Sequence, residues 1–265
     1  MKILFFIVLL LTTLITKLIA PNTFDFQTDP IQSVENLYNI QIVEPTAVIQ
    51  AEPTAAEISG MAVPTPQPDP SAGAEALFGS PKITDTFARG SSGFGLNAGL
   101  NEDDGIRIIA IDNKLSLEPK KNNGWLSWRL RPPSLKDGAA EMEFSLITCA
   151  RGDRTGIMLH APDYTSGKAY YISLACEGVL SILKESTVLG SASVQNIFKN
   201  NSGDINVITA VVSGDTIAAF LNGELALTVH DDTLPEGFSG FFTAAQGENT
   251  LKLEIHSFKE YYPEQ

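Results

Sequence analysis

The chain has 265 residues, a net charge of −13 and two cysteines, and 43% of its residues are hydrophobic. A chain of this length is too long for a disulfide-stapled miniprotein and has room for one substantial core domain with additional segments. The acidic balance excludes nucleic acid as the expected partner, because phosphate binding needs a basic patch and the sequence shows none.

Residues 1–20 form an apolar N-terminal segment that predicts export or membrane anchoring. Lys2 precedes an apolar run that extends, with one further lysine in it, to Ala20. A short positive start before such a run is typical of a signal peptide. Pro21 after the cut and Leu18 before it disfavour cleavage, so an uncleaved anchor of marginal spanning length stays open. In both cases we expect the rest of the chain to be extracellular, secreted or tethered to the membrane through this segment alone.

Residues 21–81 are predicted to be an acidic linker without a core of its own. They contain nine of the fifteen prolines, eight acidic residues and no basic residue. Such a sequence buries too little apolar surface to offset the entropy of ordering, and its proline spacing favours extended polyproline II structure. Within it, residues 31–43 are more apolar and leave a short helix or strand open. We expect this linker to act as a stalk that holds the following domain away from the cell envelope.

Residues 82–265 change to short β-branched or alternating runs separated by Gly, Asn, Asp and Pro. The twelve predicted strands are residues 107–111, 114–117, 124–130, 140–149, 156–160, 169–176, 179–184, 206–212, 216–221, 224–230, 240–243 and 251–258. Asn222-Gly223 between two apolar runs is a type I′ hairpin signal, and Glu177-Gly178 and Asp112-Asn113 predict two more hairpins. Short strands joined by turns favour an all-β, two-sheet antiparallel jelly-roll sandwich over a parallel α/β fold.

Alternation along the strands predicts which side chains form the core. Apolar residues expected on the packed faces of two strands are Met142, Phe144 and Leu146 in the first and Tyr170, Ile172 and Leu174 in the second. Tyr171 then faces the concave, partly solvated side. On the strand before them, Leu126, Trp128 and Leu130 are expected in the core, which leaves Trp125 and Arg129 on the outer face.

The motifs of residues 82–265 also follow a recognisable order. They are DTFA, GWLSWRL, AEMEFSL, GIMLHAPD, AYYISLACEGVLSILK, TIAAFLNGELAL, GFSGFF and LKLEI. This order resembles the concanavalin A-like lectin/glucanase jelly roll, in its laminin-G-like and 3-keto-disaccharide-hydrolase-like branch. The resemblance rests on scaffold patterns and not on a catalytic fingerprint, so it implies a fold more than a function.

Glucanases of this fold carry two catalytic glutamates in a Glu-x-Asp-x-x-Glu pattern on one strand. The two carboxyl groups must reach the same face, about 5–5.5 Å apart in retaining enzymes. The nearest match here is EMEFSL, which begins with Glu141 and has Leu146 where the second glutamate is required. Glu141 and Glu143 then belong to a solvated outer face. The sequence argues against this mechanism and leaves open whether the domain is an enzyme.

Five residues are candidates for contacting a ligand. His160 is expected on the concave side beside Tyr171, where the pair could stack on a sugar and hydrogen-bond to it. An ordinary exposed strand position is the alternative for His160. Trp125 is the better platform of the two tryptophans, and Arg129 and Tyr164 complete the predicted set.

Metal and disulfide chemistry are each suggested at one place. Laminin-G-like domains often hold calcium on loop carboxylates, and NEDDG at residues 101–105 clusters three acids, so calcium is the one cofactor left open. Cys149 and Cys176 have twenty-six residues between them, and an even cysteine count in an exported protein favours a bridge. Counting faces places the two cysteines on opposite sides of their strands, an objection that a bulge would remove.

Taken together, these patterns predict an exported cell-surface protein with a monomeric, non-catalytic lectin-like domain. Its expected partner is a carbohydrate or an envelope polymer, bound on the concave face. Two alternatives stay open: a glycoside hydrolase of the 3-keto-disaccharide type, and a structural or protein-binding ectodomain.

Overall fold

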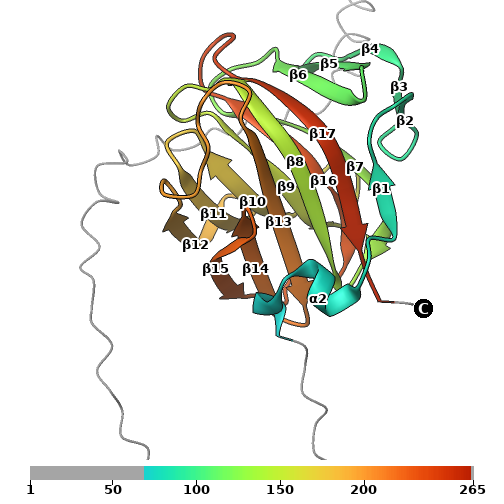
Figure 1. Ribbon diagram of the computed structural model, residues 1–265, viewed down its shortest axis with the longest axis vertical. Helices are drawn as coiled ribbons and strands as arrows, with labels where there is room; N and C mark the ends of the chain where they lie inside the picture. The colour runs from blue at the N-terminus through green and yellow to red at the C-terminus, as the bar shows by residue number, and fades with distance from the viewer. Residues whose placement is uncertain (1–68, 264–265) are drawn as a thin grey trace, which may run out of the picture. The chain divides into compact units, whose positions relative to one another are not determined.

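The computed structural model describes residues 69–263. These residues form two antiparallel sheets that pack face to face (Figure 1). The predicted N-terminal segment and most of the predicted linker lie outside the residues described. The expected all-β sandwich is confirmed.

The larger sheet, here called the major sheet, has nine strands. They are β1 (Ile83–Asp85), β4 (Gly99–Glu102), β5 (Ile106–Ile111), β6 (Lys114–Pro119), β8 (Gly138–Thr148), β13 (Ile205–Ser213), β14 (Thr216–Leu221), β15 (Glu224–His230) and β17 (Lys252–Tyr261). The strand order is β15-β14-β13-β8-β17-β6-β5-β4, and β1 pairs with β17.

The smaller, or minor, sheet has six strands in the order β12-β11-β10-β9-β16-β7. They are β7 (Trp125–Leu135), β9 (Arg154–Ala161), β10 (Tyr170–Ala175), β11 (Val179–Lys184), β12 (Thr187–Ser193) and β16 (Gly237–Ala245). A short ribbon of β2 (Gly90–Ser91) and β3 (Leu96–Asn97) stands apart. All twelve predicted strands are present, and β1 to β4 and β12 were not predicted.

The main core lies between the two sheets and contains the residues that alternation assigns to it. Met142, Phe144 and Leu146 of β8 pack there with Tyr170, Ile172 and Leu174 of β10. Tyr171 belongs to a separate cluster on the other side of the minor sheet. For β8 and β10 the predicted faces are confirmed.

For β7 the predicted faces are wrong. Leu126, Trp128 and Leu130 lie in the outer cluster with Tyr171, so they are absent from the main core. The polar side chains of β7 face the major sheet instead, where they pair with acidic side chains of that sheet. The Arg131 Nε atom lies 3.3 Å from the Glu260 carboxylate on β17.

Tight hairpins occur where the sequence places them. Asn222 and Gly223 between β14 and β15 have φ values of 53° and 84°. Asp112 and Asn113 between β5 and β6 have φ values of 54° and 59°. Both central residues of a type I′ turn need positive φ, which asparagine and glycine tolerate best. Gly178, with φ of 77°, stands in the turn between β10 and β11.

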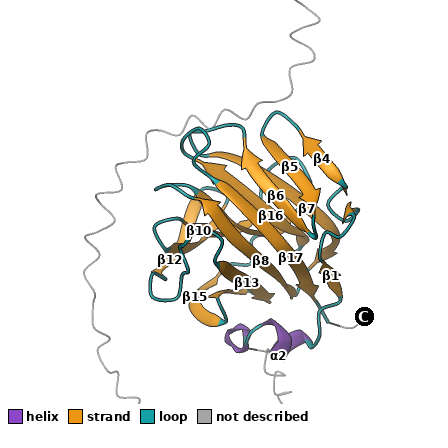
Figure 2. Cartoon of the chain, turned by 45° about the horizontal axis from the view of Figure 1, so that its top comes forward, coloured by secondary structure: helices purple, strands orange, loops and turns teal. Residues whose placement is uncertain are grey.

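A short helical segment precedes the first strand. It comprises the 3-10 turn η2 (Pro70–Ala72) and the helix α2 (Ala74–Phe78), which Figure 2 shows at one end of the sandwich. Leu77 and Phe78 pack against an apolar cluster on the outer face of the major sheet that includes Phe220. The end of the predicted linker is therefore part of the folded domain. Among residues 69–263 there is no helix long and apolar enough to span a membrane.

The predicted disulfide is present and joins the two sheets. Cys149 directly follows β8 of the major sheet and Cys176 directly follows β10 of the minor sheet. Their Cα atoms are 5.7 Å apart. Because both residues lie just past a strand end, the objection from face counting does not apply. Such a bridge is compatible with an extracellular protein.

Candidate functional site

The outer face of the minor sheet carries three rows of side chains that run across its strands. From β11 to β7 the rows are Leu183-Tyr171-Met158-Gly240-Leu130, Ser181-Ser173-Gly156-Phe242-Trp128 and Val179-Ala175-Arg154-Ala244-Leu126. Aromatic side chains therefore concentrate toward β16 and β7. Small polar side chains lie toward β11.

The loop between β9 and β10 covers the first of these rows. The Tyr171 hydroxyl donates a hydrogen bond to the Gly167 carbonyl, and the Tyr171 ring meets Phe242 edge-on at 5.1 Å. Only 3% of Tyr171 is exposed, and burial raises the pKa of its hydroxyl. Tyr171 therefore holds the loop and has no free ring face for a sugar.

The same loop places Tyr164 at the surface. Asp163 accepts hydrogen bonds from the Thr165 and Ser166 backbone N–H groups at 2.7 and 2.6 Å, and these bonds lower the pKa of Asp163 to about 2. The Tyr164 ring stacks on Phe238 with centroids 4.5 Å apart. Tyr164 is still 49% exposed, so it is a fixed aromatic side chain with an accessible surface.

An open groove of about 470 Å³ lies at the β7 edge of the minor sheet. This edge groove is lined by residues 92–95, residues 128–130, Pro132 and Tyr164. The Trp128 indole N–H donates to the Tyr164 carbonyl at 3.2 Å, which fixes the indole in the groove. Two predicted ligand residues, Arg129 and Tyr164, meet here with Trp128, which the sequence assigned to the core.

The turn between β2 and β3 forms one wall of the edge groove. A Cβ atom on Gly93 would lie 2.7 Å from the Arg131 Nη2 atom, so the turn packs closely against the Arg131 guanidinium. Phe94 packs inward against Phe241 at 5.0 Å. The wall is thus tied to the main core. Alternation does not predict this turn, because neither of its strands exceeds two residues.

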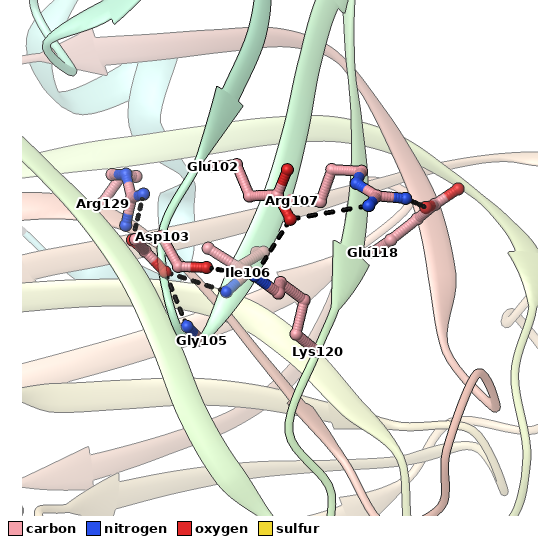
Figure 3. Close-up of polar contacts among 8 residues, drawn as sticks. All are labelled: Glu102, Asp103, Gly105, Ile106, Arg107, Glu118, Lys120 and Arg129. Atoms are coloured by element: carbon pink, nitrogen blue, oxygen red, sulfur yellow. Dashed lines mark hydrogen bonds and ion pairs between the residues drawn. The ribbon is translucent and has the colours of Figure 1, made fainter.

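Arg129 is held at the rim by the acidic loop after β4 (Figure 3). Its Nη2 atom lies 2.7 Å from Asp103 Oδ2. Burial acts to raise the pKa of Asp103, but hydrogen bonds from the Gly105 N–H and from Arg129 lower it below its usual range. The Lys120 ammonium lies 2.9 Å from Glu102.

Residues 101–105, where calcium binding is predicted, include this same loop. Glu102 and Asp103 already have basic partners, so a calcium ion would have to displace Arg129 or Lys120. Calcium binding here stays a prediction.

His160 does not share a face with Tyr171, contrary to prediction. The register between β9 and β16 shifts beside it, and its φ of 55° is that of a bulge residue. Its ring lies 5.8 Å from Tyr170, and its Nδ1–H donates to the Leu234 carbonyl at 2.6 Å. Burial lowers its pKa. Alternation along β9 could not reveal this change of direction.

Trp125 lies outside the edge groove. Its ring carries the Lys121 ammonium 3.9 Å from the centroid, a cation–π contact. Trp128 lines the edge groove in place of Trp125, because the two rows of β7 face opposite to expectation.

Acidic residues are distributed unequally between the sheets. Among the strands described, those of the minor sheet contain no Asp or Glu and four basic residues. Those of the major sheet contain eight acidic and four basic residues. Glu141, from the broken glucanase pattern, lies in the major sheet and pairs with Lys259 at 2.7 Å.

Solved structures of low sequence identity share this architecture. A Bacillus subtilis protein of unknown function with a galectin-like fold is 14% identical, with 69% of this chain and 96% of that chain covered and a TM-score of 0.54. LamAcat from Zobellia galactanivorans is 10% identical, with 71% and 99% covered and a TM-score of 0.50. The domain is a concanavalin A-like jelly roll. No protein-family model and no curated protein matches the chain.

At such identities the concanavalin A-like likeness shows the fold alone. Any function has to come from the site, and within this jelly roll the edge groove is where exposed aromatic side chains and a positioned charge meet.

Proposed function

We propose that this domain binds carbohydrate in the edge groove without cleaving it. The observation that carries the proposal is the convergence of two fixed, accessible aromatic side chains, Trp128 and Tyr164, on one open groove. Aromatic faces pack on the apolar faces of sugar rings, while a few placed polar groups orient the hydroxyls. Arg129 supplies such a group at the rim.

The absence of carboxylates from the minor sheet supports a binding role over hydrolysis. Glycoside cleavage uses two carboxyl groups that flank the scissile bond. The strands beneath the aromatic rows contain no Asp or Glu in the part of the chain described. Asp103, which reaches the rim, is occupied by Arg129. We therefore assign no catalytic residue.

We further propose that the chain is exported and that the apolar N-terminal segment directs or anchors it. The disulfide between Cys149 and Cys176 supports an oxidising compartment. The acidic, proline-rich residues 21–68 would then separate the jelly roll from the envelope. On this proposal the ligand is an extracellular glycan or envelope polymer.

The test is calorimetric titration of the protein with a panel of oligosaccharides, comparing Trp128→Ala with Trp125→Ala. Both variants remove a tryptophan from β7, but only Trp128 lines the edge groove. We expect Trp128→Ala to weaken binding about thirtyfold, as for a central aromatic contact. We expect Trp125→Ala to bind like the unmodified protein.

Tyr164→Ala should give a loss similar to Trp128→Ala, since both residues line the same groove. Equal losses for Trp125→Ala and Trp128→Ala would place the site elsewhere. Failure of every oligosaccharide to bind would leave the structural or protein-binding alternative. Release of reducing ends during the titration would show hydrolysis and contradict the non-catalytic assignment.

A further inference from the structure

One basic side chain of the minor sheet has no ion-pair partner among residues 69–263. Three of its four basic residues have a carboxylate close by: Arg129 with Asp103 at 2.7 Å, Arg131 with Glu260 at 3.3 Å and Lys184 with Asp231 at 2.9 Å. The fourth, Arg154, has neither an ion pair nor a side-chain hydrogen bond to any residue in the range 69–263.

Arg154 stands in an apolar setting on the outer face of the sheet. Its neighbours across the strands are Ala175 on β10 and Ala244 on β16. Burial lowers its pKa, and the one charge that acts against this is Glu177. The Glu177 carboxylate is itself engaged by the Gly152 N–H at 3.1 Å. A partly buried cation without a direct ion pair costs stability, and an external anion in contact with it would reduce that cost.

We propose that Arg154 binds the carboxylate of an acidic sugar, which makes uronic-acid glycans the ligand class of this domain. The inference rests on the carbohydrate binding proposed above and adds the charge of the ligand. A guanidinium matches a carboxylate with two parallel hydrogen bonds. The strands of this sheet contain no carboxylate. Glu177, which lies in the turn after β10 and acts on Arg154, is held by the Gly152 N–H.

The position of Arg154 fits a glycan that also occupies the edge groove. Trp128 on β7 and Arg154 on β9 face the same side of the sheet, with β16 between them. Strand spacing and one step of two residues place their Cα atoms about 12 Å apart. Phe242, which pairs with Trp128 and Gly156, lies between them in the rows. Gly156 places no side chain in the path.

The net charge of −13 narrows the ligand class further. A dense polyanion would be repelled by the acidic chain, and one arginine cannot offset that repulsion. A single carboxylate close to Arg154 is favoured instead, because other charges beyond about 8 Å are largely screened at physiological ionic strength. The ligand is therefore a glycan with one or a few uronic acids and not a polyphosphate or nucleic acid.

The experiment titrates the full chain with trimers of galacturonate, glucuronate and mannuronate and with their carboxyl-reduced, neutral counterparts. Each pair differs only at C6, where a neutral hydroxymethyl group replaces the carboxylate. We expect at least one acidic trimer to bind about tenfold more tightly than its reduced counterpart. Arg154→Gln should abolish this preference and leave affinity for the neutral trimer unchanged.

Arg151→Gln is the matched control, because it removes the same charge from the exposed loop next to β9 and should keep the preference. Arg154→Lys keeps the positive charge but cannot form two parallel hydrogen bonds to a carboxylate, so it should keep part of the preference for the acidic trimer. Thermal unfolding adds a readout, since removing an unpaired cation should leave the melting temperature unchanged or higher. A lower melting temperature for Arg154→Gln would instead indicate a structural role.

Equal binding of acidic and neutral trimers would overturn the role of Arg154 and leave the carbohydrate site in place. So would an unchanged preference in Arg154→Gln. The absence of binding to any trimer, acidic or neutral, would count against the proposed function itself.

Discussion

The two sheets of this jelly roll differ sharply in charge. The major-sheet strands carry eight acidic residues, and the minor-sheet strands described carry none. Where the edges of the sheets meet, basic side chains of β7 pair with acids of β1, β17 and the loop after β4. Charge complementarity therefore joins the sheets at the β7 edge, whereas apolar packing and the disulfide join them elsewhere.

The covalent link between the sheets predicts the largest effect. Replacing both cysteines in Cys149→Ala/Cys176→Ala opens a loop with a sequence separation of 27. The chain-entropy relation gives a loss of about 3.5 kcal/mol in the free energy of unfolding. Urea unfolding of the variant measures it, and the reduced unmodified protein should lose the same amount. A loss under about 1 kcal/mol would show that packing alone holds the sheets together.

The buried carboxyl group of Glu260, between the sheets, should make the free energy of unfolding depend on pH. Burial raises the pKa of Glu260 to about 7, although the Ser239 hydroxyl and Arg131 partly oppose it. The folded state therefore binds the proton more tightly than the unfolded state. Stability from this group is complete below the unfolded pKa of 4.5 and falls as pH rises through about 7. The expected loss is about 3 kcal/mol.

Glu260→Gln should remove this loss, because the amide stays neutral at every pH. Urea unfolding between pH 4 and pH 8 compares the slopes of the two proteins. Glu224→Gln, on exposed β15, is the matched control and should keep the slope of the unmodified protein. Parallel curves for the unmodified protein and Glu260→Gln would show that Glu260 titrates normally.

The same contrast between the sheets explains what the sequence could and could not predict. Alternation placed the faces of β8 and β10 correctly, because each of these strands has one apolar face against the core. It failed for β7, where Arg131 faces inward toward Glu260, a partner 129 positions later in the chain. Alternation predicts that a row of charged side chains faces solvent, because it does not show ion-pair partners that lie far away in the sequence.

Two of the five predicted ligand residues line the edge groove, and the arrangement of the groove was not predictable from the sequence. Arg129 and Tyr164 were expected to contact a ligand and do line the edge groove. His160 was misplaced because a bulge reverses its direction, and local alternation cannot register a bulge. Tyr171 does lie on the outer face, but the loop bound to its hydroxyl covers it. Whether these residues bind a ligand stays a prediction.

The hydroxyl of Tyr171 gives a smaller expected effect on the outer face of the minor sheet. Tyr171→Phe removes the hydrogen bond to Gly167 and keeps the ring against Phe242. We expect a loss of about 1 kcal/mol in the free energy of unfolding. Amide hydrogen exchange should rise in residues 162–168, the loop that carries Tyr164. Unchanged exchange there would show that the loop is held by its own turns alone.

Breaking the exposed ion pair between Asp103 and Arg129 at the groove rim should cause the smallest change in stability. Asp103→Asn keeps an oxygen for the Gly105 and Ile106 N–H groups and removes the charge that faces Arg129. Because the Asp103 side chain is 49% exposed, water and salt screen the pair, and the expected loss is about 0.5 kcal/mol. Added salt should shrink it further.

Asp103→Asn also changes the charge at the rim of the edge groove. It leaves Arg129 as a second unpaired cation on the minor sheet, at the rim of the edge groove. Affinity for an acidic trimer should then rise about threefold, while affinity for its neutral counterpart stays constant. A rise for both trimers would mean that Asp103 obstructs the groove sterically. A fall for the acidic trimer would mean that Asp103 is needed to aim Arg129 at the ligand.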